Sequence, residues 1–287
     1  MRISGLHILL TYQCTFECDH CFVWGSPWQC GTLNFEQVET ILAQAESAGV
    51  EEIYFEGGEP FLYYAILVRA VELAHQSGFR VGIVSNAYWA QTEADARLWL
   101  QPFAGKLVDL SVSSDLYHYS EAMSQQAQNA TAAATEIGIP VGTISIAQPE
   151  APGSDLMYRG RAYQELAPQS PQRSPWNTFK ECPYEDLRDP GRIHLDPLGN
   201  LHICQGISIG NLFATPLEEI CAGYDPDAHP ICGPLLHGGP AALVSEYHLP
   251  HESEYADACQ LCYEMRVHLR DRFPEALGPD QMYGVGL

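Results

Sequence analysis

Segments that favour strands and segments that favour helices alternate along the first half of the chain, and this order limits the fold more than any other feature. Apolar, β-branched runs are followed by stretches whose apolar residues recur at helical spacing. The expected strands cover residues 6–11, 52–55, 80–85, 107–112 and 139–146, and the expected helices cover residues 35–45, 62–74, 92–100 and 120–137. Strands that alternate with helices pair in parallel through right-handed crossovers, so an α/β domain is predicted. Such domains bind ligands at the carboxyl edge of the sheet.

The pattern changes after the fifth expected strand. Residues 148–176 are rich in proline, glutamine and serine, which predicts a linker. Residues 192–203 favour a hairpin with a turn at 196–199, and a last helix is expected at 258–273. We therefore divide the chain into a larger α/β domain, residues 1–165, and a smaller α+β domain, residues 166–287.

Acidic residues outnumber basic ones by 36 to 14 in this chain of 287 residues, and the formal net charge is −22. A polyanion repels phosphate groups, which argues against nucleic acids and anionic membranes as partners. No stretch is apolar enough to span a membrane, and the N-terminus lacks a signal-peptide core and cleavage site. A cytoplasmic location is therefore expected, and in that compartment the ten cysteines favour metal binding over disulfides.

Three of the cysteines form the pattern C-x3-C-x2-C directly after the first expected strand. Cys14, Cys18 and Cys21 are close enough in sequence to hold three irons of a [4Fe–4S] cluster, which leaves the fourth iron without a protein ligand. Zinc is an alternative, with Cys30 or His20 as a further ligand. Chance clustering is the third interpretation.

The segment Gly57-Gly58-Glu59-Pro60 follows the second expected strand. Its glycines permit a backbone turn close to a ligand, so that main-chain groups and Glu59 can meet an amino group. Alone, the tetrapeptide is typical of an ordinary turn. Beside the cysteine loop at the same sheet edge it becomes specific, and the combination resembles the radical S-adenosylmethionine (SAM) enzymes over residues 6–160.

The resemblance implies a partial (β/α)6 barrel and a [4Fe–4S] cluster on the three cysteines, whose open iron binds the amino and carboxylate groups of SAM. It also implies a set of residues that contact the rest of the SAM molecule, namely His20, Gly57, Gly58, Glu59, Asn86, Ser113 and Asp115. Two positions depart from the family pattern. Glu56 stands where threonine or serine is commoner, and Ser85-Asn86-Ala87 replaces the frequent Thr-Asn-Gly.

A second set of cysteines lies in the C-terminal half. Cys182, Cys204, Cys259 and Cys262 combine a hairpin pair with a C-x2-C knuckle. Four such thiols can close a tetrahedral site, which suits either structural zinc or a fully ligated [4Fe–4S] cluster. The cysteines left without a role are Cys30, Cys221 and Cys232.

The second set also carries a family resemblance. Gly199-x4-Cys204 together with the knuckle resembles the SPASM/twitch extension of radical SAM enzymes, and Gly160-Arg161-Ala162 resembles a motif that precedes this extension. His268 stands where a full SPASM domain would have its next cysteine. The resemblance therefore implies the shorter twitch form, with one auxiliary [4Fe–4S] cluster.

Radical SAM chemistry implies the reaction. The reduced cluster cleaves SAM to methionine and a 5′-deoxyadenosyl radical, and that radical abstracts hydrogen from a C–H bond. We expect the bond to lie in a peptide side chain or backbone, as in ribosomal-peptide maturases, with the auxiliary cluster assisting electron transfer. The alternatives are a small-molecule dehydrogenase or epimerase, and a non-catalytic iron–sulfur or zinc protein.

The expected partners are the substrate, a reductase or flavodoxin-type electron donor, and a separate peptide-recognition protein. The last is expected because the first strand begins within a few residues of Met1 and leaves no room for a leader-binding domain. The candidate substrate-side residues are Tyr117, His118, Arg159 and Arg161, and for each of them a structural role is the competing interpretation.

Overall fold

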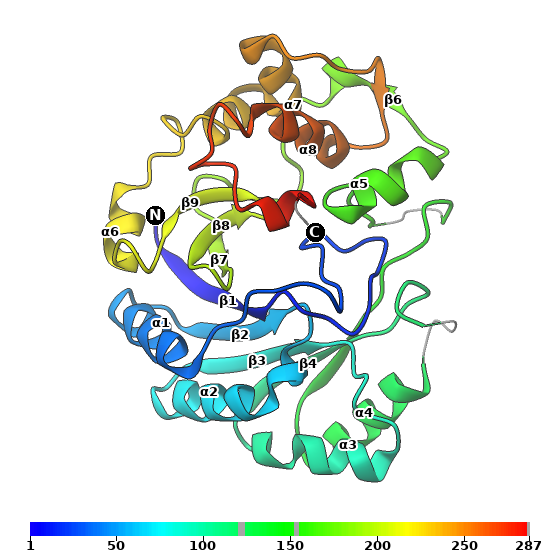
Figure 1. Cartoon of the computed structure of the whole chain (residues 1–287), viewed down its shortest axis with the longest axis vertical. Helices are drawn as coiled ribbons and strands as arrows, with labels where there is room; N and C mark the ends of the chain where they lie inside the picture. The colour runs from blue at the N-terminus through cyan, green and yellow to red at the C-terminus, as the bar shows by residue number, and fades with distance from the viewer. Residues whose placement is uncertain (120–123, 152–154, 286–287) are drawn as a thin grey trace.

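An eight-stranded sheet runs through the computed structural model, which describes residues 1–119, 124–151 and 155–285 (Figure 1). Its strands follow the order β5-β4-β3-β2-β1-β7-β8-β9. Strands β5 to β1 and β7 are parallel, whereas β7, β8 and β9 pair with one another in antiparallel fashion. The bounds are β1 (Ile3–Thr11), β2 (Glu52–Gly57), β3 (Arg80–Ser85), β4 (Leu107–Ser113), β5 (Val141–Ile144), β7 (Gly191–Leu195), β8 (Asn200–Cys204) and β9 (Ile207–Asn211).

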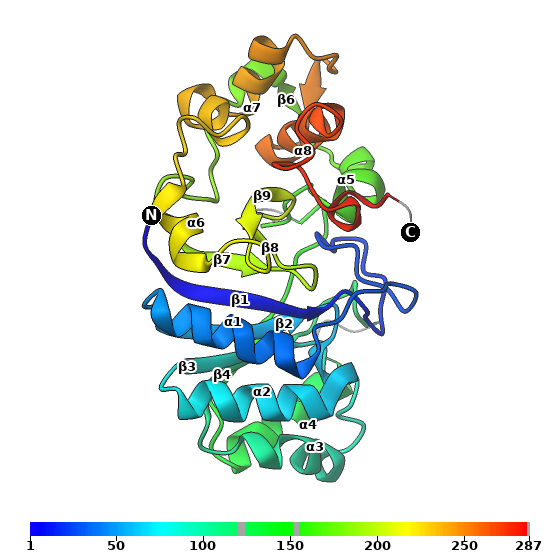
Figure 2. The ribbon, with the colours of Figure 1, turned by 60° about the vertical axis from the view of Figure 1, so that its left-hand side comes forward.

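Four helices connect the first five strands and pack on one face of the sheet, as Figure 2 shows for α1 and α2. They are α1 (Phe35–Ser47), α2 (Tyr64–Gln76), α3 (Glu93–Leu100) and α4 (Gln125–Glu136). A capping box starts α1, because Asn34 accepts a hydrogen bond from the Gln37 backbone and the Gln37 side chain returns one. The first four residues of the expected helix at 120–137 lie outside the described residues, and α4 begins after the cap Ser124.

Alternate residues of β1 serve different faces of the sheet. Leu6, Ile8 and Leu10 are buried in the core beneath the helices, whereas His7 and Leu9 border a cavity on the opposite face. This period of two is the ordinary geometry of a strand with both faces covered. The sheet thus separates an apolar core from a cavity that many polar side chains border.

The expected α/β partial barrel is confirmed, and its sixth parallel strand is β7. This strand does not follow β5 in the sheet but pairs with the free side of β1, where Leu6 lies opposite Ile193. The predicted hairpin is therefore formed by β7 and β8, and it continues the sheet of the first half. The division at residue 165 stays a prediction.

The C-terminal half packs above the β7–β9 end of the sheet (Figure 1). Its helices are α5 (Arg161–Glu165), α6 (Leu217–Gly223), α7 (Cys232–Tyr247, with a kink at Gly238 and Gly239) and α8 (Ala258–Leu269), and β6 (Ser174–Pro175) pairs with β10 (Glu254–Tyr255). Short 3-10 helices are η1 (Pro60–Tyr63), η2 (Gln101–Phe103), η3 (Ala167–Gln169), η4 (Trp176–Thr178) and η5 (Asp280–Tyr283). The prediction of a linker at 148–176 is wrong for the second part of this range, because that part forms α5, η3 and β6.

A second apolar core lies among α7, α8 and the strands β8 and β9, and it includes Leu9 and Tyr12 from the first strand and the loop that follows it. Both cores therefore draw on both halves of the chain. Within the described ranges, none of the helices combines the length and apolar character required to cross a membrane.

Candidate functional site

The first cysteine set lies on the loop that follows β1, at the carboxyl edge of the sheet. Cys14, Cys18 and Cys21 all border the lumen cavity, which has a volume of about 850 Å³. The loop is held by its own backbone, because the Cys21 N–H donates to the Cys18 carbonyl at 3.0 Å and the Cys14 N–H donates to Ser26 at 2.9 Å. The sequence motif therefore becomes three thiols on one loop that its own backbone hydrogen bonds hold at the cavity.

Hydrogen-bond donors point at two of these sulfurs. The Gly25 N–H lies 3.3 Å from Cys21 Sγ, and both the Phe16 N–H and the Asn86 side-chain amide lie 3.5 Å from Cys14 Sγ. Burial raises the pKa of the Cys14 thiol to about 12. A thiolate at neutral pH therefore requires a bound metal at this position, and N–H groups aimed at sulfur then stabilise its charge.

Gly57 and Gly58 bring the end of β2 against the cysteine loop. The Gly58 N–H donates to the Thr11 carbonyl at 2.7 Å, and a Cβ atom on Gly58 would lie 2.1 Å from the Gln13 oxygen. Gly57 has a φ of 139°, and a Cβ there would lie 2.3 Å from the Thr11 oxygen. Only glycine fits at either position, and both residues border the cavity as predicted.

Glu59 is not among the residues that line the cavity, and its expected contact with the SAM ammonium stays a prediction. Its buried carboxylate accepts hydrogen bonds from the Phe61 N–H at 3.0 Å, the Ser85 hydroxyl at 2.9 Å and the Asn86 N–H at 2.8 Å. Burial raises the pKa of this carboxyl to about 7. Glu59 therefore joins the ends of β2 and β3, and it positions the Asn86 backbone.

The other predicted SAM contacts gather on the cavity wall. His20, Asn86, Ser113 and Asp115 all border the cavity. Asp115 accepts several hydrogen bonds, among them from His118 Nδ1 at 2.8 Å and from the Ile146 N–H at 3.2 Å. Burial alone would raise the pKa of Asp115, but the hydrogen bond and charge of His118 and the charge of His20 outweigh it and lower the pKa.

Two of the candidate substrate-side residues, His118 and Tyr117, have different surroundings. His118 borders the cavity and orients Asp115. Tyr117 is not among the cavity residues, and its hydroxyl donates to the Ala147 carbonyl at 3.3 Å while its ring lies 4.8 Å from that of His20. Burial is the largest cause of the lowered pKa of His20, which is about 4, so this imidazole is neutral at pH 7.

Arg161 does not line the cavity, and its expected role on the substrate side stays a prediction. Its guanidinium is buried and donates to the Cys18 carbonyl at 2.8 Å and to the Gly25 carbonyl at 2.9 Å, so it holds the two ends of the cysteine loop together. The neighbouring Gly160 has a φ of 60°, and a Cβ there would lie 2.3 Å from Phe22 Cα. The Gly160-Arg161-Ala162 motif thus packs against the cysteine loop and stabilises it through hydrogen bonds to its carbonyl groups.

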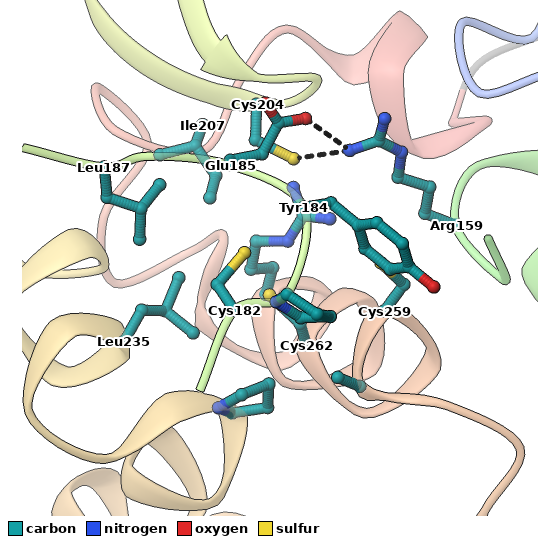
Figure 3. A pocket seen from close by; sticks show the side chains of 14 residues that line it. Arg159, Cys182, Tyr184, Glu185, Leu187, Cys204, Ile207, Leu235, Cys259 and Cys262 are labelled. Atoms are coloured by element: carbon teal, nitrogen blue, oxygen red, sulfur yellow. Dashed lines mark hydrogen bonds and ion pairs between the residues drawn. The ribbon is translucent and has the colours of Figure 1, made fainter. Parts of the chain in front are cut away.

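All four cysteines of the second set line a small pocket between the hairpin and α8 (Figure 3). Cys182 precedes the hairpin, Cys204 ends β8, and Cys259 and Cys262 occupy the first turns of α8. Figure 3 shows Arg159 at the pocket wall, where its guanidinium lies 3.0 Å from Cys204 Sγ and 3.2 Å from Glu185. The fold therefore brings together the set that the sequence pattern grouped.

A further arginine gives this pocket an unusual charge. Arg266 is 1% exposed and lines the pocket, and in the described part of the chain no carboxylate lies within ion-pair distance of it. A buried guanidinium without a counter-charge is costly. Thiolates, formed when the four cysteines bind a metal, would supply that counter-charge. Burial raises the pKa of Cys262 to about 12, so this thiol would otherwise be neutral.

Residues 8–150 match the family model described as the Radical SAM superfamily. The chain contains a radical SAM domain. YydG of Bacillus subtilis (strain 168), which is named for peptide biosynthesis, is 25% identical over 131 residues, or 45% of this chain and 41% of that protein. An S-adenosylmethionine-dependent nucleotide dehydratase of Thermoplasmatales archaeon (strain ISO4-H5) is 36% identical over 89 residues, or 30% of this chain and 29% of that protein.

The matched segments therefore span less than half of each relative. Among solved structures, BtrN in complex with AdoMet and 2-DOIA has a TM-score of 0.54 at 16% identity, and the alignment covers 77% of this chain and 82% of that chain. The likeness extends beyond the radical SAM domain, and at this identity it is a likeness of fold.

Three polar residues deep in the lumen of the radical SAM domain were not predicted. His7 on β1, Glu56 on β2 and His194 on β7 meet there, with Glu56 lying 3.4 Å from His7 Nδ1 and 3.3 Å from His194 Nε2. We call them the lumen triad. Alternation along each strand could have placed each residue on the lumen face, but the pairing of β7 with β1 is not visible in the sequence.

Burial and neighbouring charges set the pKa values of two members of the lumen triad, His194 and Glu56. Burial lowers the pKa of His194 to about 3. Burial alone would raise the pKa of Glu56, but the close approach of the His7 side chain and the charges of His194, His7 and Arg192 outweigh it, so the net change is downward. At pH 7 His194 is therefore neutral and Glu56 is ionised.

The three unassigned cysteines lie outside both cavities. Cys30 is exposed, Cys221 is buried beside α1 in the first core, and Cys232 begins α7 in the second core. Cys221 and Cys232 are placed as ordinary buried thiols.

Proposed function

We propose that this chain is a radical SAM enzyme that reductively cleaves SAM and abstracts hydrogen from a peptide side chain or backbone. The observation that carries the proposal is that the first cysteine set and the two glycines after β2 border one cavity of about 850 Å³. Small-ligand sites have volumes of about 300–1,000 Å³, so this cavity offers room for SAM and part of a substrate.

Cys14, Cys18 and Cys21 would hold the catalytic [4Fe–4S] cluster, and the N–H groups aimed at Cys14 and Cys21 fit such a group. When bound, the cluster supplies the electron that cleaves SAM and so yields the 5′-deoxyadenosyl radical. Gly57 and Gly58 would let the backbone approach the methionine end of SAM. The walls of the cavity would limit the access of water to the reacting atoms.

His20, Asn86, Ser113 and Asp115 would line the nucleoside part of the SAM site. Asp115 is ionised and already oriented by His118, so it can accept a hydrogen bond from a ribose hydroxyl. Neutral His20 offers a flat imidazole face beside it. His118 would act through Asp115 and is a positioning residue.

We assign an auxiliary [4Fe–4S] cluster of the twitch type to Cys182, Cys204, Cys259 and Cys262. Two buried guanidiniums at their pocket favour an anionic group there. In the described ranges, two groups of three His, Cys, Asp or Glu side chains bring their ligand atoms within 4.8 Å of one another, and neither contains a cysteine. Tetrahedral zinc would hold thiolates about 3.8 Å apart, so the wider spacing favours a cluster.

The substrate is assigned from the relatives and the lumen. YydG is named for peptide biosynthesis, which supports a peptide. The second candidate is a small polar molecule, because another relative is a nucleotide dehydratase and because Glu52, Asp109 and Arg192 border the cavity. The expected partners are a reductase or flavodoxin-type electron donor and, for a peptide substrate, a separate recognition protein.

The first test is reductive cleavage of SAM. Protein purified without oxygen and loaded with iron and sulfide should produce 5′-deoxyadenosine when SAM and dithionite are added. Cys18→Ala should abolish this product, because it removes a ligand of the catalytic cluster. Cys30→Ala, a change at an exposed cysteine outside both sets, should leave it unchanged. No 5′-deoxyadenosine from fully loaded protein would refute the enzymatic proposal.

The second half of the test identifies the substrate class. Deuterated peptides and deuterated small molecules encoded or made by neighbouring genes are offered separately, and deuterium in 5′-deoxyadenosine is measured by mass spectrometry. Transfer from a peptide supports the first candidate, and transfer only from small molecules replaces it with the second.

A further inference from the structure

The lumen triad is built by strand geometry. In the parallel ladders, His7 lies opposite His194 on one side and opposite Tyr54 on the other, and Glu56 follows Tyr54 by two residues on the same face. Three adjacent strands therefore present two imidazoles and one carboxylate to one point of the lumen. The Tyr54 ring stacks on His7 at 4.8 Å with an interplanar angle of 11°, which fixes the plane of that imidazole.

The contacts within the triad are not those of a hydrogen-bonded cluster. The distances from Glu56 to the two imidazoles are 3.3 and 3.4 Å, beyond the usual 2.7–3.2 Å, and His7 Nδ1 is buried without a hydrogen-bond partner. In the other histidine cluster of the cavity, by contrast, His118 Nδ1 lies 2.8 Å from Asp115. The side chains of the lumen triad thus point into the cavity, and they do not satisfy one another's hydrogen-bonding groups.

The spacing suits a metal ion. Ligands at 2.0–2.1 Å from a tetrahedral zinc ion are about 3.3 Å apart, close to the two measured separations. Two histidines and one glutamate are a common ligand set for catalytic zinc, and an ion held by them keeps an open position. Imidazole must be neutral and carboxylate ionised to bind a metal, and His194 and Glu56 meet these conditions.

We propose that His7, Glu56 and His194 bind one divalent transition-metal ion of the zinc class on the lumen wall. The Gln205 side-chain amide, 3.5 Å from His194 Nε2, contributes a further polar group, and exchange of its oxygen and nitrogen would offer the ion a buried carbonyl. The site also accounts for Glu56, the residue that departs from the radical SAM pattern, because threonine or serine could not reach both imidazoles as a charged ligand.

The role of the ion rests on the proposed function, whereas the site itself does not. Its open position faces the cavity. A substrate oxygen or nitrogen bound there would be anchored in the same cavity that the first cysteine set borders. This favours substrates that carry a hydroxyl, carboxylate or carbonyl near the reacting carbon.

The test uses zinc itself. Cluster-loaded protein is incubated with one equivalent of Zn²⁺ without oxygen and desalted, and the zinc content and the zinc K-edge X-ray absorption spectrum are recorded. Wild type should keep about one zinc per chain, with a nitrogen and oxygen shell at about 2.0–2.1 Å. Glu56→Gln and His194→Gln should each lower the zinc content at least tenfold, since even changes to residues behind the ligands weaken metal sites by about 10–100-fold.

Glu52→Gln is the matched control, because Glu52 lies on the same strand and borders the same cavity. It should keep the zinc of the wild type, and unchanged iron content in all variants reports that they fold. A sulfur shell at about 2.3 Å, equal zinc in Glu56→Gln and wild type, or no zinc in wild type would overturn the proposal. The zinc spectrum does not depend on SAM cleavage, so the two proposals fail separately.

Discussion

Arg159 and Arg161 lie two positions apart in the sequence, and each contacts a different cysteine set. Arg161 donates to backbone carbonyls of the first cysteine loop, while Arg159 reaches the other way to Cys204 Sγ. The short segment that carries both arginines therefore contacts the first cysteine loop and the four-cysteine pocket. Arg159 and its ion-pair partner Glu185 border both cavities.

The four-cysteine assignment predicts the iron content of single variants. Cys259→Ala should lower iron from about eight to about four per chain, because one four-iron cluster loses a ligand and is not retained. Iron and acid-labile sulfide analysis of protein loaded without oxygen measures this directly. Formation of 5′-deoxyadenosine should persist in this variant, since the first cysteine set is intact.

Cys232→Ala is the control for that variant. Cys232 is a buried thiol close to the pocket in the fold but does not line it. It should keep about eight irons per chain. A loss of four irons in Cys232→Ala, with none in Cys259→Ala, would show that the ligand set has been assigned to the wrong cysteine.

The amino-acid sequence predicted some features of the candidate sites and missed others. Cysteine spacing pointed to both thiol groups, and the paired glycines to the turn between β2 and η1, because these features are local in sequence. Glu59 and Arg161 were assigned to ligand or substrate, yet both bind the protein's own backbone. Their roles depend on which strand ends become neighbours, and that information is not local.

The hairpin of β7 and β8 is fastened at its turn by one carboxylate. Asp196 is fully buried and accepts hydrogen bonds from Tyr12 at 2.8 Å, from the Asn200 side chain at 2.9 Å and from His202 at 3.0 Å. The bond from Tyr12 ties the end of β1 to the hairpin. The turn was predicted from Asp-Pro-Leu-Gly, but its link to the first strand was not.

Replacing this carboxylate should loosen the hairpin. Asp196→Ala should lower the free energy of unfolding by about 3–5 kcal/mol, because several buried donors lose their partner. Urea unfolding followed by circular dichroism without oxygen measures the change. Asp186→Asn, which alters an exposed turn carboxylate, should change the free energy by less than about 1 kcal/mol.

The same carboxylate predicts a dependence on pH. Burial alone would raise the pKa of Asp196. The hydrogen bond and the charge of His202, together with the hydrogen bonds from Asn200, outweigh burial and lower the pKa below the usual 3.8. Its stabilising contribution is therefore complete above pH 3.8 and is lost as the pH falls through the folded-state pKa. The difference in unfolding free energy between wild type and Asp196→Ala should be constant at neutral pH and shrink in acid; a constant difference in acid would contradict this.

The elements themselves were largely predictable, since each of the first five strands and four helices has its own periodicity. The partner of β1 was not. A parallel ladder between Ile3–Thr11 and Gly191–Leu195 joins segments about 180 residues apart, and apolar patterning does not record such pairings. The short α5 was missed because five residues are too few to show a helical period.

At the scale of the whole molecule, the two halves share one sheet and both cores. A chain of residues 1–165 alone should therefore be insoluble or aggregated, because β1 becomes an open edge and loses the cover of Ile193 and Leu195. Residues 1–224, which add β7 to β9 and α6, complete the first core and should be more soluble. Soluble fraction and size-exclusion chromatography compare the two.

If residues 1–165 were monomeric and retained a full catalytic cluster, the radical SAM domain would be independent of the hairpin. The division of the chain at residue 165 would then describe a folding unit. If only the longer chain is soluble, the boundary marks a change of topology within one folding unit.

The central position of β1 also has a consequence during synthesis. This strand leaves the ribosome before its second neighbour, β7, and about 180 further residues are made before β7 is complete. At about 5–20 residues per second, one side of β1 stays unpaired for roughly ten to forty seconds. Iron–sulfur assembly on the nascent first cysteine loop would thus take place on a half-formed sheet, so chaperone binding and cluster delivery compete for the same interval.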